Sequence, residues 1–580
     1  MISLNESVIE INFPKLNHFW MDAGLLGLYR IAHKEKEQFK ESGVEIILND
    51  SGVSFKGSEK NIQAVLQKTY DRLLKDYYNT STQSQIDENK GFYYDKEKKQ
   101  FIRFPRVKPM GIAGLVKISG KSFKNQGIAK LEKKLDSQYP ILEKKYSEIQ
   151  DRFEKFLADS KLKPEKSILL NGRNIVSPSI NIDKISGHAQ GCCFLCGKES
   201  SSFSDITGTV FPFITGPSGV LTFKNLGGHV EKVCWKCDFI SKFVPVTGFY
   251  SMYYDSKKDP RTHIYFPYST SLEKMNAVFS SLDAAKKEDP HLMRNFDNWL
   301  GGYFQKPYEQ FFTFLYSLYR IVMTKRTSTA ADDDDYELDY EALCDVNLNN
   351  SPLDFFVMYT ESLGDAQMGK MIWPFHESVY LFRLFDHLER NKINIPVVMH
   401  QLVDFDKVKQ KQPENASIIR NRVCENILNK QSIVAYIEQH AFRINKSESK
   451  DIGPLNDFVI LYEKTIREGD TGMEQKIIDI AVNVGKTIGT SIAPSGKKGK
   501  GDLFRLRKTR KPEDFLNEIN RIQMKYGTEL TEGLLNQGQK MEENFTEFKQ
   551  FCMIAALNTY NAENPAPIKS GGKIKAEASS

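Results

Sequence analysis

The residues whose types and spacing most specifically predict chemistry are two Cys-x-x-Cys pairs, Cys193 with Cys196 and Cys234 with Cys237. The two residues between paired cysteines form a tight knuckle, which lets both sulfurs face one ion. Four thiolates can close a tetrahedral shell around Zn²⁺ and leave no coordination position for substrate or water. We therefore expect a structural zinc site with these four cysteines as its ligands.

The sequence leaves alternatives to this zinc site open. The paired thiols could instead be reducible or form disulfides, and the insert between the two pairs is longer than in most zinc ribbons. Cys192 adjoins the first pair, and His188 and His229 lie nearby, so one of them could replace a cysteine as ligand. Disulfides are rare in reducing compartments, which favours the metal.

A first basic segment lies between Arg103 and Lys130, where glycines recur and no acidic residue occurs. This composition fits either a solvated surface hairpin or a loop whose lysines contact phosphates while amide side chains reach base edges. The candidate contacts in this segment are Lys117, Lys121, Lys124, Asn125 and Gln126.

A second basic segment, residues 497–511, is the strongest electrostatic signal of the chain. Eight basic residues there oppose a single acidic one, Asp502, which gives a local net charge of +7. The segment predicts an arm between two helices that lies along a phosphate backbone, and a disordered basic loop is the alternative. The candidate contacts are Lys497, Lys498, Lys500, Arg505, Arg507, Lys508 and Arg510.

The elements that must position these residues follow from hydrophobic periodicity. Helices are expected over 17–39 and 62–77, and strands over 44–48, 53–55, 92–94 and 101–104. After about residue 292 the pattern is chiefly helical, and three helices are expected near 477–488, 515–522 and 545–557.

The predicted fold class is α+β: a mixed N-terminal domain with a small zinc-knuckle insertion, followed by a mainly helical region and a C-terminal helical bundle. The expected domains are a mixed α/β domain with the basic loop at 1–185, the zinc-knuckle insertion at 186–245, a mainly helical central region at 246–470, the bundle at 473–560 and a disordered tail at 561–580.

Composition restricts the classes of function. The chain has 580 residues, with 80 Lys and Arg against 74 Asp and Glu, so any contact with nucleic acid must come from local basic patches. The first six residues lack the features of a signal peptide, and no apolar run is long enough to span a membrane. We expect a cytoplasmic protein without membrane contact.

No motif of an enzyme active site is present. The sequence contains no GxSxG, no HExxH and no Walker A motif, since the glycines at 114 and 120 are one residue too far apart for a phosphate loop. The prediction is therefore a protein that binds or assembles and does not catalyse.

The layout of the chain resembles a known family. Residues 17–28 open the mixed N-terminal region, the two Cys-x-x-Cys knuckles stand near the middle, and residues 503–508 belong to the helical C-terminal part. This combination is similar to the CXXC-CXXC large subunit of type I-B CRISPR surveillance complexes (Cascade). The likeness covers most of the chain in layout, with the knuckles as its specific motif.

The resemblance implies a non-catalytic, antiviral subunit at the 5′ end of the crRNA. Such a subunit recognises the PAM in target double-stranded DNA, supports R-loop formation beside the displaced single strand and recruits a separate helicase-nuclease. It contacts crRNA and other Cascade backbone subunits, and its C-terminal bundle corresponds to the small subunit. We expect the first basic segment on the PAM side and the second on a nucleic-acid backbone.

The resemblance also implies that the small subunit can be made separately. Met473 stands just before the predicted bundle, so translation starting there would give a product of residues 473–580 and hence separate small-subunit copies. An ordinary internal methionine is the equal alternative.

Two other classes of function fit the knuckles. One is a zinc-ribbon nuclease or another nucleic-acid-modifying enzyme. The other is a zinc-containing transcription regulator that binds duplex DNA without a guide RNA.

Overall fold

The structure is a computed structural model. It describes residues 8–34, 43–77, 91–95, 100–103, 129–130, 155–156, 158–159, 168–170, 191–206, 211, 231–254, 260–282, 286, 294–300, 304, 306–329, 354–363, 366–409, 413–446, 450–467, 475–529 and 538–565.

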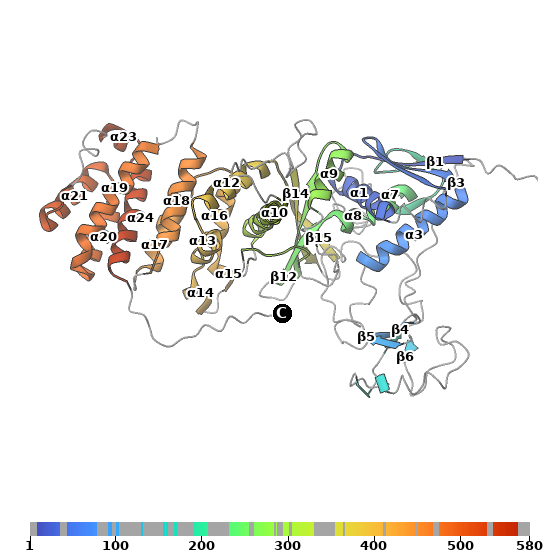
Figure 1. Cartoon of the computed structure of the whole chain (residues 1–580), viewed down its shortest axis with the longest axis horizontal. Helices are drawn as coiled ribbons and strands as arrows, with labels where there is room; N and C mark the ends of the chain where they lie inside the picture. The colour runs from blue at the N-terminus through green and yellow to red at the C-terminus, as the bar shows by residue number, and fades with distance from the viewer. Residues whose placement is uncertain are drawn as a thin grey trace, which may run out of the picture. The chain divides into compact units, whose positions relative to one another are not determined.

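The fold is mixed α+β, as predicted, and divides into two compact units (Figure 1). The α+β unit comprises Met1–Asp297 with Ile321–Val379, and the helical unit comprises Asn298–Arg320 with Tyr380–Ser580.

The first elements of the α+β unit are β1 (Val8–Pro14), α1 (Phe19–Lys34), β2 (Glu45–Asn49), β3 (Gly52–Ser58), α3 (Glu59–Tyr77), β4 (Gly91–Asp95), β5 (Gln100–Arg103), β6 (Ala129–Lys130) and β7 (Ile168–Leu170). They are followed by β8 (Gly191–Cys192), β9 (Glu199–Ser200), β10 (Phe203–Asp205), β11 (Lys232–Cys234), α7 (Trp235–Ser241), α8 (Val244–Thr247), β12 (Phe249–Tyr254), β13 (Pro260–Tyr268), α9 (Leu272–Leu282), β14 (Asp354–Leu363) and β15 (Ala366–Phe375).

Helix α1 is the centre of this unit. Nearly every residue of its first three turns is buried, which is typical of a helix that packs on all sides. On one side it meets the antiparallel sheet β12-β13-β14-β15, where Phe19 stacks on Phe356 with ring centroids 4.5 Å apart. Trp20 approaches Phe266 of the same sheet edge-on at 5.7 Å. A second antiparallel sheet has the strand order β1-β3-β2, and helix α3 follows β3 directly in the chain.

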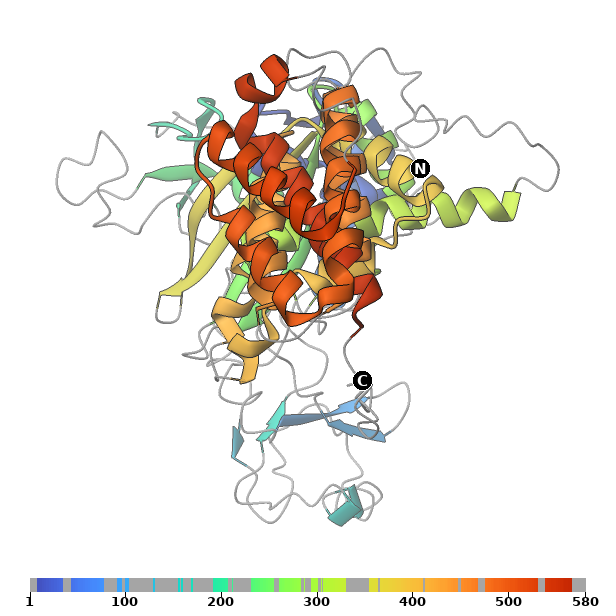
Figure 2. The same ribbon diagram turned by 90° about the vertical axis from the view of Figure 1, so that its left-hand side faces the viewer.

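The helical unit is built from α10 (Pro307–Thr329, in this unit to Arg320), α12 (Ser378–Arg390), α13 (Ile395–Gln401), α14 (Phe405–Lys409), α15 (Pro413–Ala416), α16 (Ile418–Leu428), α17 (Val434–Ile444) and α18 (Gly453–Ile466). It ends with α19 (Gln475–Ile492), the 3₁₀ turn η5 (Ala493–Ser495), α20 (Lys497–Arg507), α21 (Pro512–Tyr526), α23 (Gly538–Glu543) and α24 (Phe545–Glu563). Figure 2 shows the last of these helices, in orange to red, packed side by side.

Two glycines bring α19 and α24 into backbone contact. A Cβ atom at Gly485 would lie 2.2 Å from the carbonyl oxygen of Cys552, and one at Gly489 would lie 2.6 Å from that of Ala556. Neither position can hold a side chain unless the helices separate. The close packing places α24 at the centre of the bundle, where it also contacts α17, α18 and α20.

A buried polar network joins α18 to α17 and α24. The Glu463 carboxylate, fully buried, accepts hydrogen bonds from the backbone N–H groups of Ile433 and Val434 at the start of α17. Arg467 pairs with Glu463 at 2.9 Å and with Glu547 of α24 at 3.0 Å. The bundle therefore extends to the N-terminal side of residue 473, and a product of residues 473–580 would keep Glu547 but lack both Glu463 and Arg467.

The structure adds three features that the expected domains do not describe. The segment 246–470, expected to be mainly helical, also contributes the four strands β12 to β15 to the α+β unit. Helix α7 of the expected insertion at 186–245 packs against α1 and belongs to the core. The expected disordered tail begins too early, because Asn561 is a buried residue of α24 whose side chain donates to Asn445 at 3.0 Å.

Among the described residues, no helix is both long and apolar enough to cross a membrane.

We expect Gly485→Ala to lower the free energy of unfolding of the helical unit by about 1–3 kcal/mol, because overpacking forces the two helix backbones apart. Denaturant titration followed by circular dichroism measures this change. Thr490→Ala, on the exposed side of the same helix, is the control and should change stability by less than about 0.5 kcal/mol. Equal stability of the Gly485→Ala variant and the wild type would contradict the packing described here.

Candidate metal centre and basic surface

The structure brings the four predicted cysteines together. All four Sγ atoms of Cys193, Cys196, Cys234 and Cys237 lie within 4.8 Å of one another, and the Sγ atoms of Cys196 and Cys234 are 3.8 Å apart. A tetrahedron with metal–sulfur bonds of about 2.3 Å has an edge of about 3.8 Å. The sulfurs are therefore spaced to hold one tetrahedral metal ion such as zinc.

The first knuckle is a tight turn between β8 and β9. The backbone N–H of Gly197 donates to the carbonyl of Cys193 at 2.8 Å, and Cys193 donates to the carbonyl of Lys198 at 2.8 Å. Gly197 has a φ of 68°, a left-handed conformation that glycine adopts without steric strain. This turn directs the Cys193 and Cys196 sulfurs to the same side.

The second knuckle joins a strand to a helix. Cys234 ends β11 and is the N-cap of α7, and Cys237 lies in the first turn of that helix. The Cys234 N–H donates to the Cys193 sulfur at 3.3 Å, and the Phe194 N–H donates to the Lys232 carbonyl at 2.9 Å. These bonds hold the two knuckles face to face.

The four thiols lie so close together that they shift one another's pKa values in opposite directions. Hydrogen bonds from the other three thiols, Cys196 first, lower the pKa of the Cys193 thiol, while hydrogen bonding to Cys193 raises the pKa of the Cys237 thiol. One thiolate is thus stabilised by its protonated neighbours. Four thiolates at these distances repel one another, so all four can ionise together only around a cation.

Helix α7 carries the second knuckle into the core of the α+β unit. A Cβ atom at Gly24 of α1 would lie 2.4 Å from the Ile240 carbonyl oxygen, and one at Gly27 would lie 2.3 Å from that of Phe243. Lys236, between the two cysteines, donates to the Asn12 carbonyl of β1 at 2.8 Å. Sequence reasoning missed this coupling, although two glycines three residues apart in an apolar helix are a signal of close helix packing.

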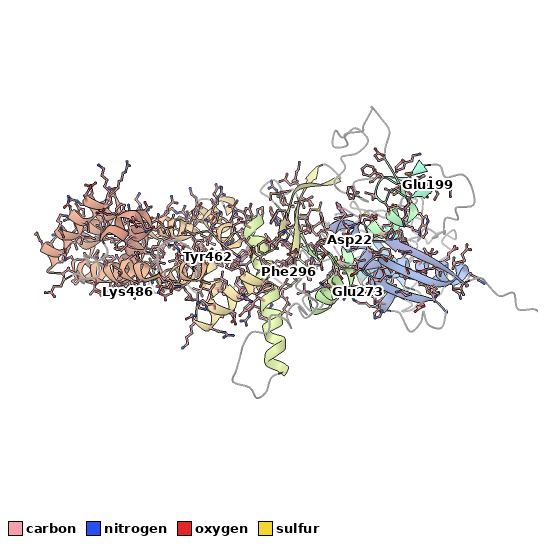
Figure 3. The ribbon with its side chains drawn as sticks, turned by 90° about the horizontal axis from the view of Figure 1, so that it is seen from above. Asp22, Glu199, Glu273, Phe296, Tyr462 and Lys486 are labelled. Atoms are coloured by element: carbon pink, nitrogen blue, oxygen red, sulfur yellow. The ribbon has the colours of Figure 1, made fainter. Side chains whose placement is uncertain are left out.

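The other candidate ligands do not join the cluster. The Cys192 side chain is exposed and is not part of the group of four, and His188 and His229 lie outside the described residues. The four clustered cysteines are free thiols. Within the part of the chain that the structure describes, no other set of three or more His, Cys, Asp or Glu side chains is close enough to hold a metal ion. Figure 3 labels Glu199 on β9, beside the first knuckle, and Asp22 on α1.

Residues 497–507 of the second basic segment form a helix and not an extended arm. Helix α20 spans Lys497–Arg507, and its Leu503 and Leu506 side chains are buried in the bundle. Gly499 permits a close approach, since a Cβ atom there would lie 2.1 Å from the Ile492 carbonyl oxygen. These packing positions outweigh the repulsion between the basic residues and fix the helix on α19 and α24.

Burial and ion pairs divide the basic residues of this segment into two groups. Arg507 forms a bidentate pair with Glu438 at 2.6 and 3.0 Å and stacks on Phe442, and Arg505 pairs with Glu518 at 3.0 Å. Lys500 is half-buried, and burial lowers the pKa of its amine. The residues exposed to solvent are Lys497, Lys498, Arg505, Lys508, Arg510 and Lys511.

The side chain of Asp502, the single acidic residue of α20, accepts hydrogen bonds inside the bundle. Asp502 accepts hydrogen bonds from Arg521 at 2.8 Å, Lys525 at 2.5 Å and Tyr526 at 2.6 Å, all on α21. Burial raises the pKa of the Asp502 carboxyl, but the hydrogen bonds from α21 outweigh it and bring the pKa to about 2. The carboxylate therefore locks α20 to α21 and leaves the outer face of α20 without a negative charge.

The structure does not describe most of the first basic segment. The candidate contacts Lys117, Lys121, Lys124, Asn125 and Gln126 lie outside the described residues.

Comparison with known proteins gives no family. No protein-family model matches the chain, and no curated protein matches it.

We expect the purified protein to contain about one metal ion per chain and Cys237→Ser to lose it, because three sulfurs no longer close the shell. Elemental analysis by mass spectrometry measures the metal content, and thermal unfolding should show a less stable α+β unit. Cys192→Ser is the matched control, since that cysteine is exposed and outside the cluster. Metal-free wild-type protein, or full retention by Cys237→Ser, would contradict the proposed ligand set.

We expect Asp502→Asn to destabilise the helical unit at pH 7, and the difference from wild type to shrink as the pH falls. The pKa of Asp502 is lower in the folded state, about 2, than its ordinary value of 3.8. Its stabilising effect is therefore complete above pH 3.8 and disappears as the pH falls toward 2. Urea unfolding at several pH values measures the difference, with the exposed Glu529→Gln as control. If the difference in stability between wild type and Asp502→Asn did not change with pH, the charge of the Asp502 carboxylate would not be its cause.

Proposed function

We propose that this protein is a non-catalytic, nucleic-acid-binding subunit of a crRNA-guided antiviral complex, similar to the large subunit of type I-B Cascade. The observation that carries the proposal is the exposed basic face at α20, formed by Lys497, Lys498, Lys508, Arg510 and Lys511. In the described part of the chain, no ion pair is formed by these five side chains. Lys497 and Lys498 lie on α20, and Lys508, Arg510 and Lys511 lie in the connection to α21. Exposed cations without ion pairs are suited to neutralising phosphates.

The proposed ligands follow from the chemistry of this face. Lysines and arginines that reach phosphates bind without reading the sequence, which suits crRNA, a guide–target duplex or a displaced DNA strand, where base pairing supplies the specificity. Arg507 is not part of the proposed contact because Glu438 and Phe442 hold its guanidinium. PAM recognition, R-loop support, recruitment of the helicase-nuclease and a cytoplasmic location belong to the same proposal.

We propose zinc as the metal of the four-cysteine centre. Thiolate ligands in tetrahedral geometry select Zn²⁺ among the common divalent ions, although iron–sulfur chemistry uses the same ligands. With all four positions taken by sulfur, zinc would hold β8 to β11 and α7 together. Its role is to support the α+β unit, and nucleic acid is contacted elsewhere.

Co-purification from the native host tests the proposal directly. We expect the protein to be recovered in an assembly that contains crRNA and other protein subunits, and the purified protein to bind DNA without cutting it in Mg²⁺ or Mn²⁺. Cleavage would support a nucleic-acid-modifying enzyme instead. Binding of duplex DNA by the isolated chain, with no RNA or partner, would support a transcription regulator.

The basic face has its own test. Lys497→Glu with Lys498→Glu should weaken binding of single-stranded DNA and lower the slope of log affinity against log salt by about 0.7 for each phosphate that the variant no longer neutralises. Fluorescence anisotropy at several salt concentrations measures both. Lys392→Glu with Lys446→Glu is the matched control, because it makes the same change of charge at exposed sites elsewhere in the helical unit. Equal effects of the two double variants would show that only net charge matters.

A further inference from the structure

The start of α20 contains three glycines within six residues, and the fold explains two of them. Gly496 has a φ of 52° in the turn before the helix, where its carbonyl accepts a hydrogen bond from the Tyr560 hydroxyl at 2.9 Å. Gly499 faces the bundle and has no room for a Cβ atom beside Ile492. Both glycines are needed for the way α20 docks on α19 and α24.

Gly501 has no such explanation. It lies within α20, its backbone is not in the left-handed region, and a Cβ atom there would meet nothing within 4 Å. The residue is exposed. Glycine in the interior of a helix is less favourable than alanine because it loses more conformational freedom on folding. The folded chain therefore retains a destabilising residue at a position where any helix-forming residue would fit.

The neighbours of Gly501 on the helix surface are basic. Lys497 and Lys498 precede it by four and three residues, and Lys508 follows it by seven, which places these three exposed cations on the same face. Arg505, four residues on, is paired with Glu518 at 3.0 Å. Asp502 is turned into the bundle toward α21. Gly501 is thus a gap without a side chain in the middle of a positively charged stripe.

We propose that the sugar–phosphate backbone of a bound nucleic acid lies against α20 at Gly501. The inference rests on the proposed function. Without a Cβ atom, the helix lets a ligand backbone approach closely, and the flanking cations then reach phosphates on both sides of the crossing. The helix supplies no free N–H group at this point, so the contribution of Gly501 is steric and that of the three cations is electrostatic.

The test compares Gly501→Ala and Gly501→Gln in the full-length chain. Both variants should raise the thermal unfolding temperature of the helical unit, by about 2–4 °C, because each is a better helix former than glycine. Gly501→Gln should nevertheless weaken binding of a nucleic acid by about tenfold, with a smaller effect for Gly501→Ala. Asn520→Ala and Asn520→Gln, at an exposed position of α21, are the controls and should leave binding unchanged.

The two ligands measured are an oligo-dT strand and a duplex of equal length. Weaker binding of either by Gly501→Gln supports the inference, and the affected ligand shows whether the backbone is single- or double-stranded. If Lys497→Glu with Lys498→Glu weakens binding but Gly501→Gln does not, the inference is wrong and the proposed function stands. If the wild type binds neither the oligo-dT strand nor the duplex, the proposed function fails with it. A lower unfolding temperature for Gly501→Ala would show that the fold itself needs this glycine and would overturn the inference.

Discussion

The contact between α1 and α7 is the constraint on which the rest of the α+β unit depends. Gly24 lets α1 touch the backbone of α7 at Ile240, and Gly27 lets it touch Phe243, just before α8, so no other residue fits at either position without moving this segment. Since α7 begins at the second knuckle, its place fixes Cys234 and Cys237. Two bonds between the knuckles then fix the first pair. A metal bound to the four sulfurs would thus stabilise the packing of α1, and the packing of α1 preorganises the sulfurs, so metal binding and folding are linked.

The helical unit also depends on two glycines that let backbones touch, here those of α19 and α24. Gly485 and Gly489 bring α19 onto α24, and the bundle forms around that pair. Polar anchors then set the direction of the outer helices: Glu463 caps α17 and, through Arg467, ties α18 to α24. A buried ion pair contributes little net stability after its desolvation, but removal of a single partner is strongly destabilising. These pairs therefore specify which helices are neighbours more than they strengthen the bundle.

Part of this structure could be predicted from the sequence and part could not. The paired cysteines and the periodic helices α1, α3, α19, α21 and α24 were predictable, because spacing and the 3.6-residue repeat are local signals. Helix α20 was not, since its charges and glycines indicate a loop and its stability comes from burying Leu503 and Leu506. The strands β12 to β14 were missed because both of their faces are largely buried, which removes the alternation that marks a strand. Long-range pairs such as Arg507 with Glu438 leave no local pattern.

The central place of α24 has a consequence for how the protein is made. Helices α17, α18, α19 and α20 all pack on α24, yet every one of them is translated before it. Until that helix leaves the ribosome, Gly485 and Gly489 face no partner and the apolar side chains around them stay exposed. The C-terminal part of the helical unit therefore completes its core only after α24 has been synthesised, and until then the nascent chain is open to aggregation or to binding by chaperones.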